Sequence, residues 1–373
     1  MPASLINYLT AVQFGAGAVA ELPALLKKHG ITRPMLVTDP GLVALGLPER
    51  LPVEPHVVFS DVPTNPTEES VVAGATVFRE NDCDGIIALG GGSPIDCAKG
   101  ISILATHPEP LDQYALIRGG LTKISSDKPP VIAIPTTSGT GSEAGRGALI
   151  SFSSGEKLAL ISPHVIPTAA ICDPQLTLDL PSRLTAATGM DAISHCVETF
   201  CSPKVNAVAD AIALDGLTRA FESLRAAVAN GFDLHHRTEM MMASLQGGLT
   251  FQKGLGMIHS LSHPLGALPD KPLHHGTLNA IFLSHVLRFN AEACPEKLDR
   301  MAKAMKCGEG RNLPAVFERL TQDIGLPQKL SELGVTEADL DDIPKLAMAD
   351  HSTQSNPREM TLEDCRNILR LSL

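Results

Sequence analysis

The chain of 373 residues has no tryptophan, only two tyrosines and no run of lysine or arginine. A nucleic-acid surface needs basic side chains and stacking rings, and the formal net charge of -11 also opposes it. No apolar run approaches the length of a membrane span, and Met1 to Tyr8 lacks the basic and apolar pattern of a signal peptide. We therefore expect a cytoplasmic protein with neither a nucleic-acid partner nor a membrane partner.

Disulfide-type spacing is also missing. The eight cysteines include no Cys-x-x-Cys pair, and a chain of this length can bury a core without covalent staples. Hydrophobic residues make up 44% and charged residues 19%, an ordinary balance for a globular protein. These numbers predict reduced thiols and room for two domains.

Short apolar strands alternate with helical periodicity in the first half of the chain. Residues 35–38, 56–59 and 85–89 have strand character, whereas residues 19–29 and 67–81 have helical spacing. Such alternation is typical of a parallel sheet covered by helices, as in nucleotide-binding α/β domains.

A glycine-rich segment follows the third of these strands. Gly90, Gly91 and Gly92 let the backbone turn sharply, and Ser93 with Asp96 fits a capping box in which Pro94 is the first helical residue. The free amides of a helix that begins here suit a pyrophosphate. The alternative is a glycine-rich turn that is capped for stability alone, with Asp96 as a cap because its charge would oppose a phosphate.

A second polar loop follows the next buried strand, residues 131–134. It runs Pro-Thr-Thr-Ser-Gly-Thr-Gly-Ser-Glu over residues 135–143, and by itself it fits an ordinary polar turn. Two such loops at the ends of neighbouring strands favour a ligand site, since α/β sheets bind ligands at that edge. Beyond Pro181 the pattern becomes helical, which predicts an α/β domain over residues 1–181 and an all-α domain over residues 182–373.

Two clusters of metal-ligand residues lie in the second half. Asp191 and His195 stand one helical turn apart, as do His259 and His263, and His274-His275-Gly276 follows. A single pair of this kind is more often a hydrogen-bonded pair on a helix, but residues 254–275 contain four of the thirteen histidines. Imidazoles combined with one carboxylate favour a site for Fe(II) or Zn(II).

Six motifs occur in order over nearly the whole chain. They are Gly-Gly-Gly-Ser-x-x-Asp-x-Ala-Lys at 90–99, Pro-Thr-Thr-x-Gly-Thr-Gly-Ser-Glu at 135–143, Asp-Pro at 173–174, Ala-Ala-Thr-Gly-Met-Asp-Ala-x-x-His at 186–195, His-x-x-x-His-x-Leu-Gly at 259–266 and His-Gly at 275–276. In this combination the chain resembles the iron-containing (group III) alcohol dehydrogenases. The resemblance implies a dehydroquinate-synthase-like fold with an NAD(P)-binding α/β domain and a helical metal-binding domain.

The resemblance also implies roles for individual residues. The implied metal ligands are Asp191, His195, His259 and His275, and His263 corresponds to a histidine near the nicotinamide. The implied cofactor residues are Gly91, Gly92, Ser93, Asp96, Thr136, Thr137 and Thr140, with Asp39 at the adenosine ribose. A carboxylate at that last position repels a 2′-phosphate, so NAD is favoured over NADP.

The chain departs from the family pattern at two places. The interval after His259 is about two residues longer, and His-His-Gly replaces the usual Pro-His-Gly, so His274 remains an alternative to His275. Arg146 follows the second loop, where it fits either a salt bridge or a clamp for a substrate carboxylate.

The function implied by the resemblance is the NAD-dependent interconversion of a small primary alcohol and its aldehyde, assisted by iron or zinc. Arg146 extends this expectation to an ω-hydroxy acid or its semialdehyde. The alternative enzyme is a lyase of the same fold that uses NAD transiently. The resemblance also implies a homodimer or a larger homo-oligomer.

Overall fold

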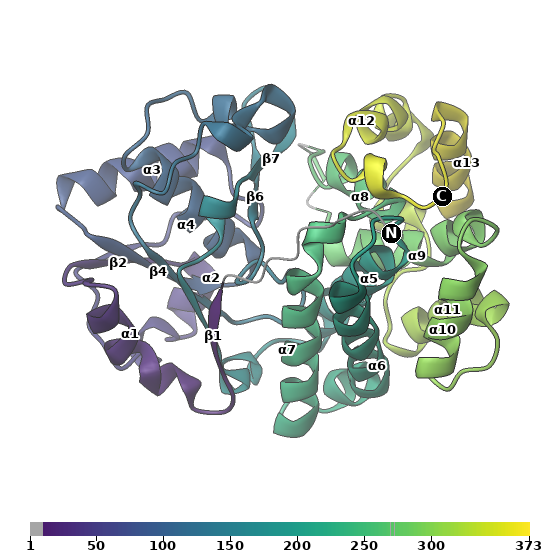
Figure 1. Ribbon diagram of the computed structural model, residues 1–373, viewed down its shortest axis with the longest axis horizontal. Coiled ribbons are helices and arrows are strands. Elements are labelled where there is room, and N and C mark those ends of the chain that lie inside the picture. The colour runs from purple at the N-terminus through teal and green to yellow at the C-terminus, as the bar shows by residue number, and fades with distance from the viewer. Residues whose placement is uncertain (1–9, 269, 272) are drawn as a thin grey trace. The chain divides into compact units, whose positions relative to one another are not determined.

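The computed structural model describes residues 10–268, 270–271 and 273–373. The expectation about the N-terminal segment, and the first nine residues of the domain expected over 1–181, lie outside this part of the chain. The described chain forms two compact units (Figure 1). We call residues 10–137 and 141–178 the α/β unit, and residues 138–140 and 179–373 the helical unit.

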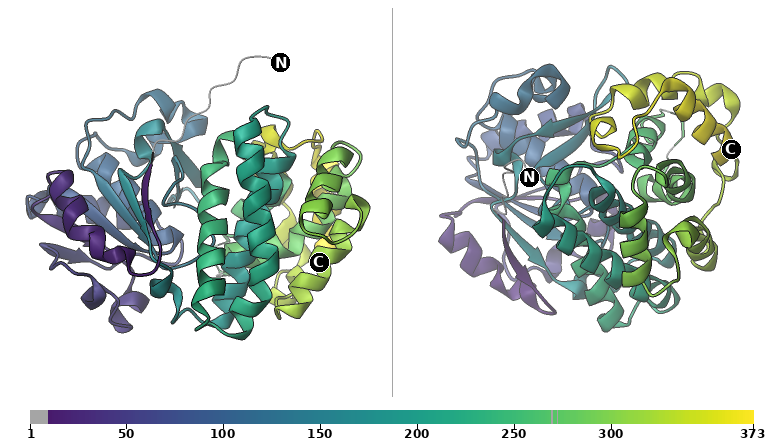
Figure 2. Two further views of the ribbon diagram at one scale, coloured as in Figure 1. Left: turned by 60° about the horizontal axis from the view of Figure 1, so that its bottom comes forward. Right: turned by 45° about the vertical axis from the view of Figure 1, so that its right-hand side comes forward.

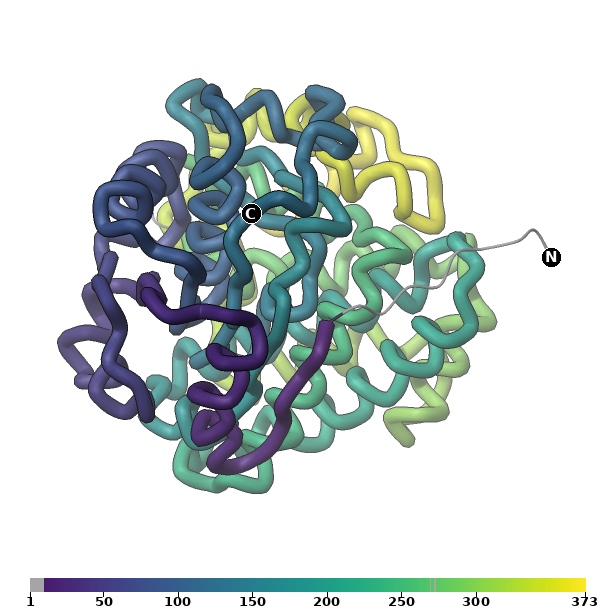
Figure 3. The backbone as a smooth tube through the Cα atoms, turned by 60° about the vertical axis from the view of Figure 1, so that its left-hand side comes forward, coloured from purple at the N-terminus to yellow at the C-terminus, as the bar shows by residue number. Residues whose placement is uncertain are grey.

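The α/β unit is built on a parallel sheet of six strands in the order β1-β8-β5-β4-β2-β3. The strands are β1 Ala11–Phe14, β2 Pro34–Val37, β3 Val57–Phe59, β4 Gly85–Gly90, β5 Val131–Pro135 and β8 Ala169–Cys172. Helical segments connect the parallel strands in chain order from β1 to β5 (Figure 3). The expected fold class, an α/β domain followed by an all-α domain, is confirmed.

Both faces of this sheet are covered, which explains why its strands are apolar throughout. Ile87 and Leu89 of β4 pack against α1, whereas Ile86 and Ala88 pack against α3 and α4 on the opposite face. The helices of this unit are α1 Leu22–Lys28, α2 Pro40–Ala44, α3 Glu68–Glu80 and α4 Gly92–Leu104. A separate antiparallel pair, β6 Gly147–Ser151 and β7 Lys157–Ile161, packs beside α4.

The helical unit surrounds one large apolar core. Its helices are α5 Ser182–Cys201, α6 Ala207–Ala229, α7 Leu234–Leu249, α8 Met257–Leu265, α9 His275–Asn290, α10 Pro295–Ala304, α11 Leu313–Asp323, α12 Ile343–Ala349 and α13 Leu362–Ser372. Helices α5, α6 and α7 lie side by side (Figure 2). The last seventeen residues of α5 are all buried, which makes α5 the central helix of this unit.

The sequence patterns miss three elements. Strand β1 is half-exposed, so it lacks the apolar run that marks the inner strands. Helices α2 and α12 contain only five and seven residues, too few for a helical period to be recognised.

The expected capping box at α4 is wrong. Helix α4 begins at Gly92, its N-cap is Gly91, and no side chain caps it. The Ser93 hydroxyl donates to the carbonyl of Thr64, and Asp96 turns towards β6. Ser93 and Asp96 therefore form hydrogen bonds with residues distant in sequence and do not cap α4.

Candidate metal centre and cofactor loops

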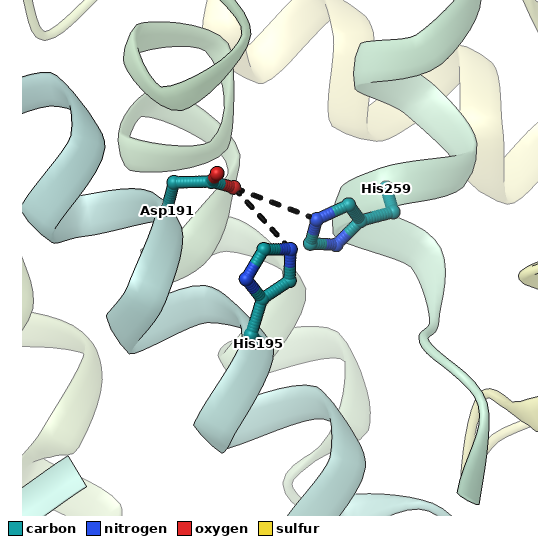
Figure 4. Close-up of side chains that lie close together, drawn as sticks. All are labelled: Asp191, His195 and His259. Carbon is teal, nitrogen blue, oxygen red and sulfur yellow. Dashed lines mark ion pairs between the residues drawn. The ribbon is translucent and has the colours of Figure 1, made fainter. Parts of the chain in front are cut away.

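Helix α5 presents three ligand-type side chains on one buried face. Asp191, His195 and Glu198 stand at positions i, i+4 and i+7, and each residue is less than 5% exposed. Figure 4 shows Asp191 and His195 projecting from this helix towards His259 of a neighbouring helix. The expected helical pairing of Asp191 with His195 is therefore present.

Three imidazoles converge on a single carboxylate oxygen. Oδ1 of Asp191 lies 3.5 Å from Nε2 of His195, 3.7 Å from Nε2 of His259 and 3.6 Å from Nε2 of His275. Ligand atoms held about 2.1 Å from an ion at the corners of a tetrahedron lie about 3.4 Å apart. The separations of Asp191 from the three imidazoles fit such a coordination shell.

His275 rather than His274 provides the third imidazole. His275 is the first residue of α9, whereas His274 is the N-cap residue that precedes the helix. This arrangement agrees with the match of the His-Gly motif at Gly276. It supports His275 over His274 as the fourth metal ligand.

Each imidazole of the cluster also contacts an oxygen atom through its other nitrogen. Nδ1 of His259 lies 2.6 Å from Oε2 of Glu198, and Nδ1 of His195 lies 3.2 Å from the carbonyl oxygen of Gly139. Nδ1 of His275 lies 3.4 Å from the hydroxyl of Ser262. Contacts of this kind fix the tautomer and the ring orientation of metal-binding histidines, and they leave Nε2 facing the carboxylate.

Glu198 and Asn279 also contact the cluster, although the sequence did not predict either of them. Glu198 lies one turn beyond His195, but its partner His259 comes from α8, so only the tertiary fold reveals the contact. Asn279 donates from Nδ2 to Oδ1 of Asp191 at 2.8 Å, and the same nitrogen lies within 3.2 Å of Nε2 of both His259 and His275. The spacing of His275 and Asn279, one helical turn on α9, was the available signal.

Charge in the cluster favours a cation. Burial alone would raise the pKa of Asp191, but the three neighbouring histidines lower it well below its usual range. Burial lowers the pKa of His195 to about 4, so this imidazole is neutral. Burial also opposes charge on His259, yet Glu198 and Asp191 raise its pKa to about 9. The carboxylates that favour a proton on His259 equally favour a divalent cation, so the residues present fit a bound metal.

His263 lies at the edge of the cluster. Its ring stacks on His275 with centroids 5.4 Å apart and planes 13° from parallel, and its Nδ1 lies 2.8 Å from Oδ2 of Asp350. His263 therefore neighbours the cluster, while its nearest charged partner is Asp350.

The glycine-rich loop and the first residues of the second polar loop lie next to each other in the α/β unit. The amide of Thr136 donates to the carbonyl oxygen of Gly90, and a Cβ added to Gly91 would lie 3.3 Å from Thr137. Ser93 lies in the first turn of α4 beside Gly92. The expected cofactor residues Gly91, Gly92, Ser93, Thr136 and Thr137 thus meet at one edge of the sheet, whereas Thr140 belongs to the helical unit.

Asp39 and Asp96 both have partners within the protein. Asp39 follows β2, and its Oδ1 accepts a hydrogen bond from the amide of Leu42 at the start of α2. Asp96 accepts from the hydroxyl of Ser142 at 2.5 Å and from the amide of Leu149 at 2.9 Å. Asp96 therefore joins α4 to the second loop.

Arg146 stands on an anchored turn. The buried Lys99 donates from Nζ to the carbonyl oxygens of Gly145 and Gly147, and the amide of Ser162 donates to the carbonyl oxygen of Arg146 itself. The side chain of Arg146 is exposed and forms no ion pair with any described residue. The salt-bridge alternative is thus absent from the described chain, and the guanidinium is available to an anion.

Comparisons with known proteins agree with this geometry. A model described as iron-containing alcohol dehydrogenase matches residues 10–174, and one described as Fe-containing alcohol dehydrogenase family, C-terminal, matches residues 185–373. The fold and the cluster define a metal-site oxidoreductase with a nucleotide-binding α/β unit. The chain belongs to the iron-containing alcohol dehydrogenase family.

Individual relatives cover almost the entire chain. The chain is 47% identical to a 4-hydroxybutyrate dehydrogenase of Cupriavidus necator, and the match covers 99% of this chain and 100% of the relative. A crystal structure of 1,3-propanediol oxidoreductase is 37% identical, with a TM-score of 0.91 over 99% of this chain and 100% of the other. The sulfoacetaldehyde reductase from Bifidobacterium kashiwanohense, solved in complex with NAD+, is 27% identical, with a TM-score of 0.89 over 99% of both chains. These relatives favour an oxidoreductase over the lyase alternative.

None of the described helices combines the length and the apolar character that a membrane crossing requires.

Proposed function

We propose that this enzyme interconverts a small primary alcohol and its aldehyde with NAD(H), and that its preferred substrate carries a terminal carboxylate. The convergence of three imidazoles on Asp191 carries the proposal, since it supports a bound divalent metal. The 4-hydroxybutyrate dehydrogenase relative supports an ω-hydroxy acid or its semialdehyde as the substrate class.

Asp191, His195, His259 and His275 would hold the metal. Iron is favoured by the family, and zinc suits the same donors. When bound, the metal supplies Lewis-acid chemistry that lowers the pKa of an alcohol hydroxyl. Glu198 and the Gly139 carbonyl keep the imidazoles of His259 and His195 oriented, and His263 would hold the proton that leaves the alcohol.

NAD would bind the α/β unit at the edge where the two polar loops meet. The first-turn amides of α4, with Gly91, Gly92 and Ser93, suit a pyrophosphate, and Thr136 and Thr137 lie beside them. Thr140 and Asp96 are the remaining proposed cofactor residues. Asp96 would act by supporting the second loop through its hydrogen bond from Ser142. Asp39 would accept hydrogen bonds from the adenosine ribose and disfavour NADP.

We propose that residues 1–181 bind the cofactor and that residues 182–373 bind the metal. We also propose a cytoplasmic homo-oligomer, a dimer or larger, in keeping with the family.

Arg146 would bind the substrate carboxylate. A guanidinium pairs with a carboxylate through two parallel hydrogen bonds, and a hydrogen bond to a charged group contributes about 1.5–3 kcal/mol. The variant Arg146→Ala should therefore lose about 10- to 100-fold in kcat/KM for succinic semialdehyde and change little for butanal. NADH oxidation with both aldehydes, on protein loaded separately with iron and with zinc, measures this.

Arg311→Ala is the matched control, because Arg311 is an exposed arginine of the helical unit. Equal losses for both aldehydes would contradict the carboxylate role. Absence of NADH-linked turnover with every aldehyde would contradict the proposed reaction itself.

A further inference from the structure

A short segment after α12 runs along α8 and is joined to it at three levels. Asp350 contacts His263, the hydroxyl of Thr353 lies 2.9 Å from that of Ser260, and Asn356 accepts from the amide of Met257 at 3.1 Å. The contacting residues recur every three positions in the segment after α12 and every three positions in α8. Their numbers rise along one segment and fall along the other, so the two segments are antiparallel. We call these three contacts the α8 ladder.

The contact between Asp350 and His263 differs from the other two contacts of the α8 ladder because one of its partners is an imidazole. Oδ2 of Asp350 lies 2.8 Å from Nδ1 of His263, and Oδ1 accepts from the amide of Ser352 at 2.8 Å. Nδ1 of His351 lies 3.6 Å from the same Oδ1. Both carboxylate oxygens are therefore engaged, and the side chain is only 9% exposed.

The ionised state of Asp350 decides which nitrogen of His263 carries hydrogen. Burial alone would raise the pKa of Asp350, but His263 and His351 lower it well below its usual range. An ionised carboxylate only accepts hydrogen bonds, so Nδ1 of His263 must be the donor. In the neutral ring this leaves Nε2 as the acceptor.

Ring stacking adds a second constraint on His263. Its plane lies 13° from that of His275 and 15° from that of His351, with centroid separations of 5.4 Å and 5.7 Å. Two nearly parallel imidazoles thus contact His263, and Asp350 holds one edge of its ring. The direction of its Nε2 is set by both contacts.

We propose that Asp350 is a positioning residue, which holds the tautomer and the ring direction of His263 so that Nε2 can accept a proton or a hydrogen bond from the reacting partners. The inference rests on the proposed function for the role of His263. The remaining two contacts of the α8 ladder hold α8 in place but touch no imidazole.

The variants Asp350→Ala, Asp350→Asn and Thr353→Val separate positioning from scaffolding. Asp350→Ala should lower kcat about 10- to 100-fold, with bound metal and NAD affinity unchanged, by analogy with the loss of other carboxylates that orient an imidazole. Asp350→Asn keeps an acceptor oxygen and should recover part of kcat. Thr353→Val removes the middle contact of the ladder and should alter stability while kcat stays within about twofold.

Nitrogen-15 NMR of the zinc-loaded protein reports the tautomer directly, with the His263 signals assigned by their loss in His263→Gln. Hydrogen on Nδ1 in the parent, with a shift towards Nε2 in Asp350→Ala, supports the proposal. An unchanged tautomer, or equal kcat losses in Asp350→Ala and Thr353→Val, overturns it.

Titration with zinc tests whether His263, Asp350 and His351 form a cation site instead. A second equivalent of zinc that binds the parent and is lost in Asp350→Ala would overturn the proposal, because the cluster of His263, Asp350 and His351 would then be a cation site. If the parent shows no NADH-linked turnover, the proposed function fails, whereas the tautomer measurement still decides the role of Asp350.

Discussion

Glu198 receives two hydrogen bonds from adjacent positions of α8. Its Oε1 accepts from the amide of Ile258, and its Oε2 accepts from Nδ1 of His259, both at 2.6 Å. The same residue therefore orients the imidazole and satisfies an amide at the start of α8.

Replacing Glu198 should weaken metal binding without removing a ligand. In Glu198→Gln an amide oxygen accepts from His259 less strongly, and we expect the metal dissociation constant to rise about 10- to 100-fold. Competition with a chelator of known affinity measures this constant. Glu222→Gln, an exposed change on α6, is the control, and equal affinities in the two variants would contradict the role of Glu198.

Glu143 predicts a pH dependence in the α/β unit. Burial raises its pKa from 4.5 to about 7, although Lys99 opposes the shift. The folded state then keeps a proton that the unfolded state releases, so this contribution to stability is fully present below pH 4.5 and is lost as pH rises through 7.

The variant Glu143→Gln cannot ionise and should flatten this dependence. The fall in free energy of unfolding between pH 5 and pH 8 should be smaller than in the parent by about 2–3 kcal/mol, as measured by urea titration at each pH. Glu80→Gln, at an exposed position, should keep the slope of the parent. A slope in Glu143→Gln equal to that of the parent would refute the raised pKa.

Sequence spacing predicts a residue's partners only when the partners share an element. Asp191 and His195 could be paired in advance because one helical turn separates them. Glu198 and Asp350 could not, since their imidazole partners lie 61 and 87 positions away and the match depends on how helices pack. Motif resemblance supplied the four metal-ligand candidates, but it says nothing about the groups that orient them.

At the scale of elements, a glycine sets how closely α9 approaches α5. A Cβ on Gly276 would lie 2.1 Å from the carbonyl oxygen of Ala187 and 3.2 Å from Cβ of Asp191. The two helices carry His275 and Asp191, so their close approach brings the two candidate ligands together.

Gly276→Ala should force α5 and α9 apart. Overpacking of this kind costs about 1–3 kcal/mol, and the separation should also reduce bound metal. Denaturant unfolding together with metal analysis measures both effects. Gly147→Ala, whose Cβ would come no nearer than 3.5 Å to its neighbours, should retain its metal, and full metal content in Gly276→Ala would argue against the packing role.

Elements with strong periodicity were predictable, and elements defined by context were not. The inner strands β2, β4 and β5 are continuous apolar runs because helices cover both faces of the sheet. At α4 the capping box failed, since Asp96 is committed to Ser142 and Leu149 rather than to its own helix end.

At the scale of the whole molecule, the candidate metal ligands all belong to the helical unit, and most of the candidate cofactor residues belong to the α/β unit. A ligand stabilises the unit whose folded form binds it, by about 2.7 kcal/mol when its concentration is 100 times the dissociation constant. Metal and cofactor should therefore protect different parts of the chain.

Removal of the metal by a chelator should loosen the helical unit selectively. Hydrogen exchange should accelerate in peptides from α5, α8 and α9, while peptides from β4 and β5 keep their protection. Addition of NAD to the chelated protein should slow exchange at α4 instead. Uniform loss of protection over both units on chelation would contradict the separate assignment.

The α8 ladder limits how the length of the chain can vary. Its contacts recur every three residues on both partners, so inserting or deleting one residue between Asp350 and Asn356 would misalign at least one of the three. Surface turns such as residues 230–233 carry no such repeat. A homologue that keeps this spacing can orient the equivalent of His263 in the same way, whereas one that changes it must hold that histidine by other means.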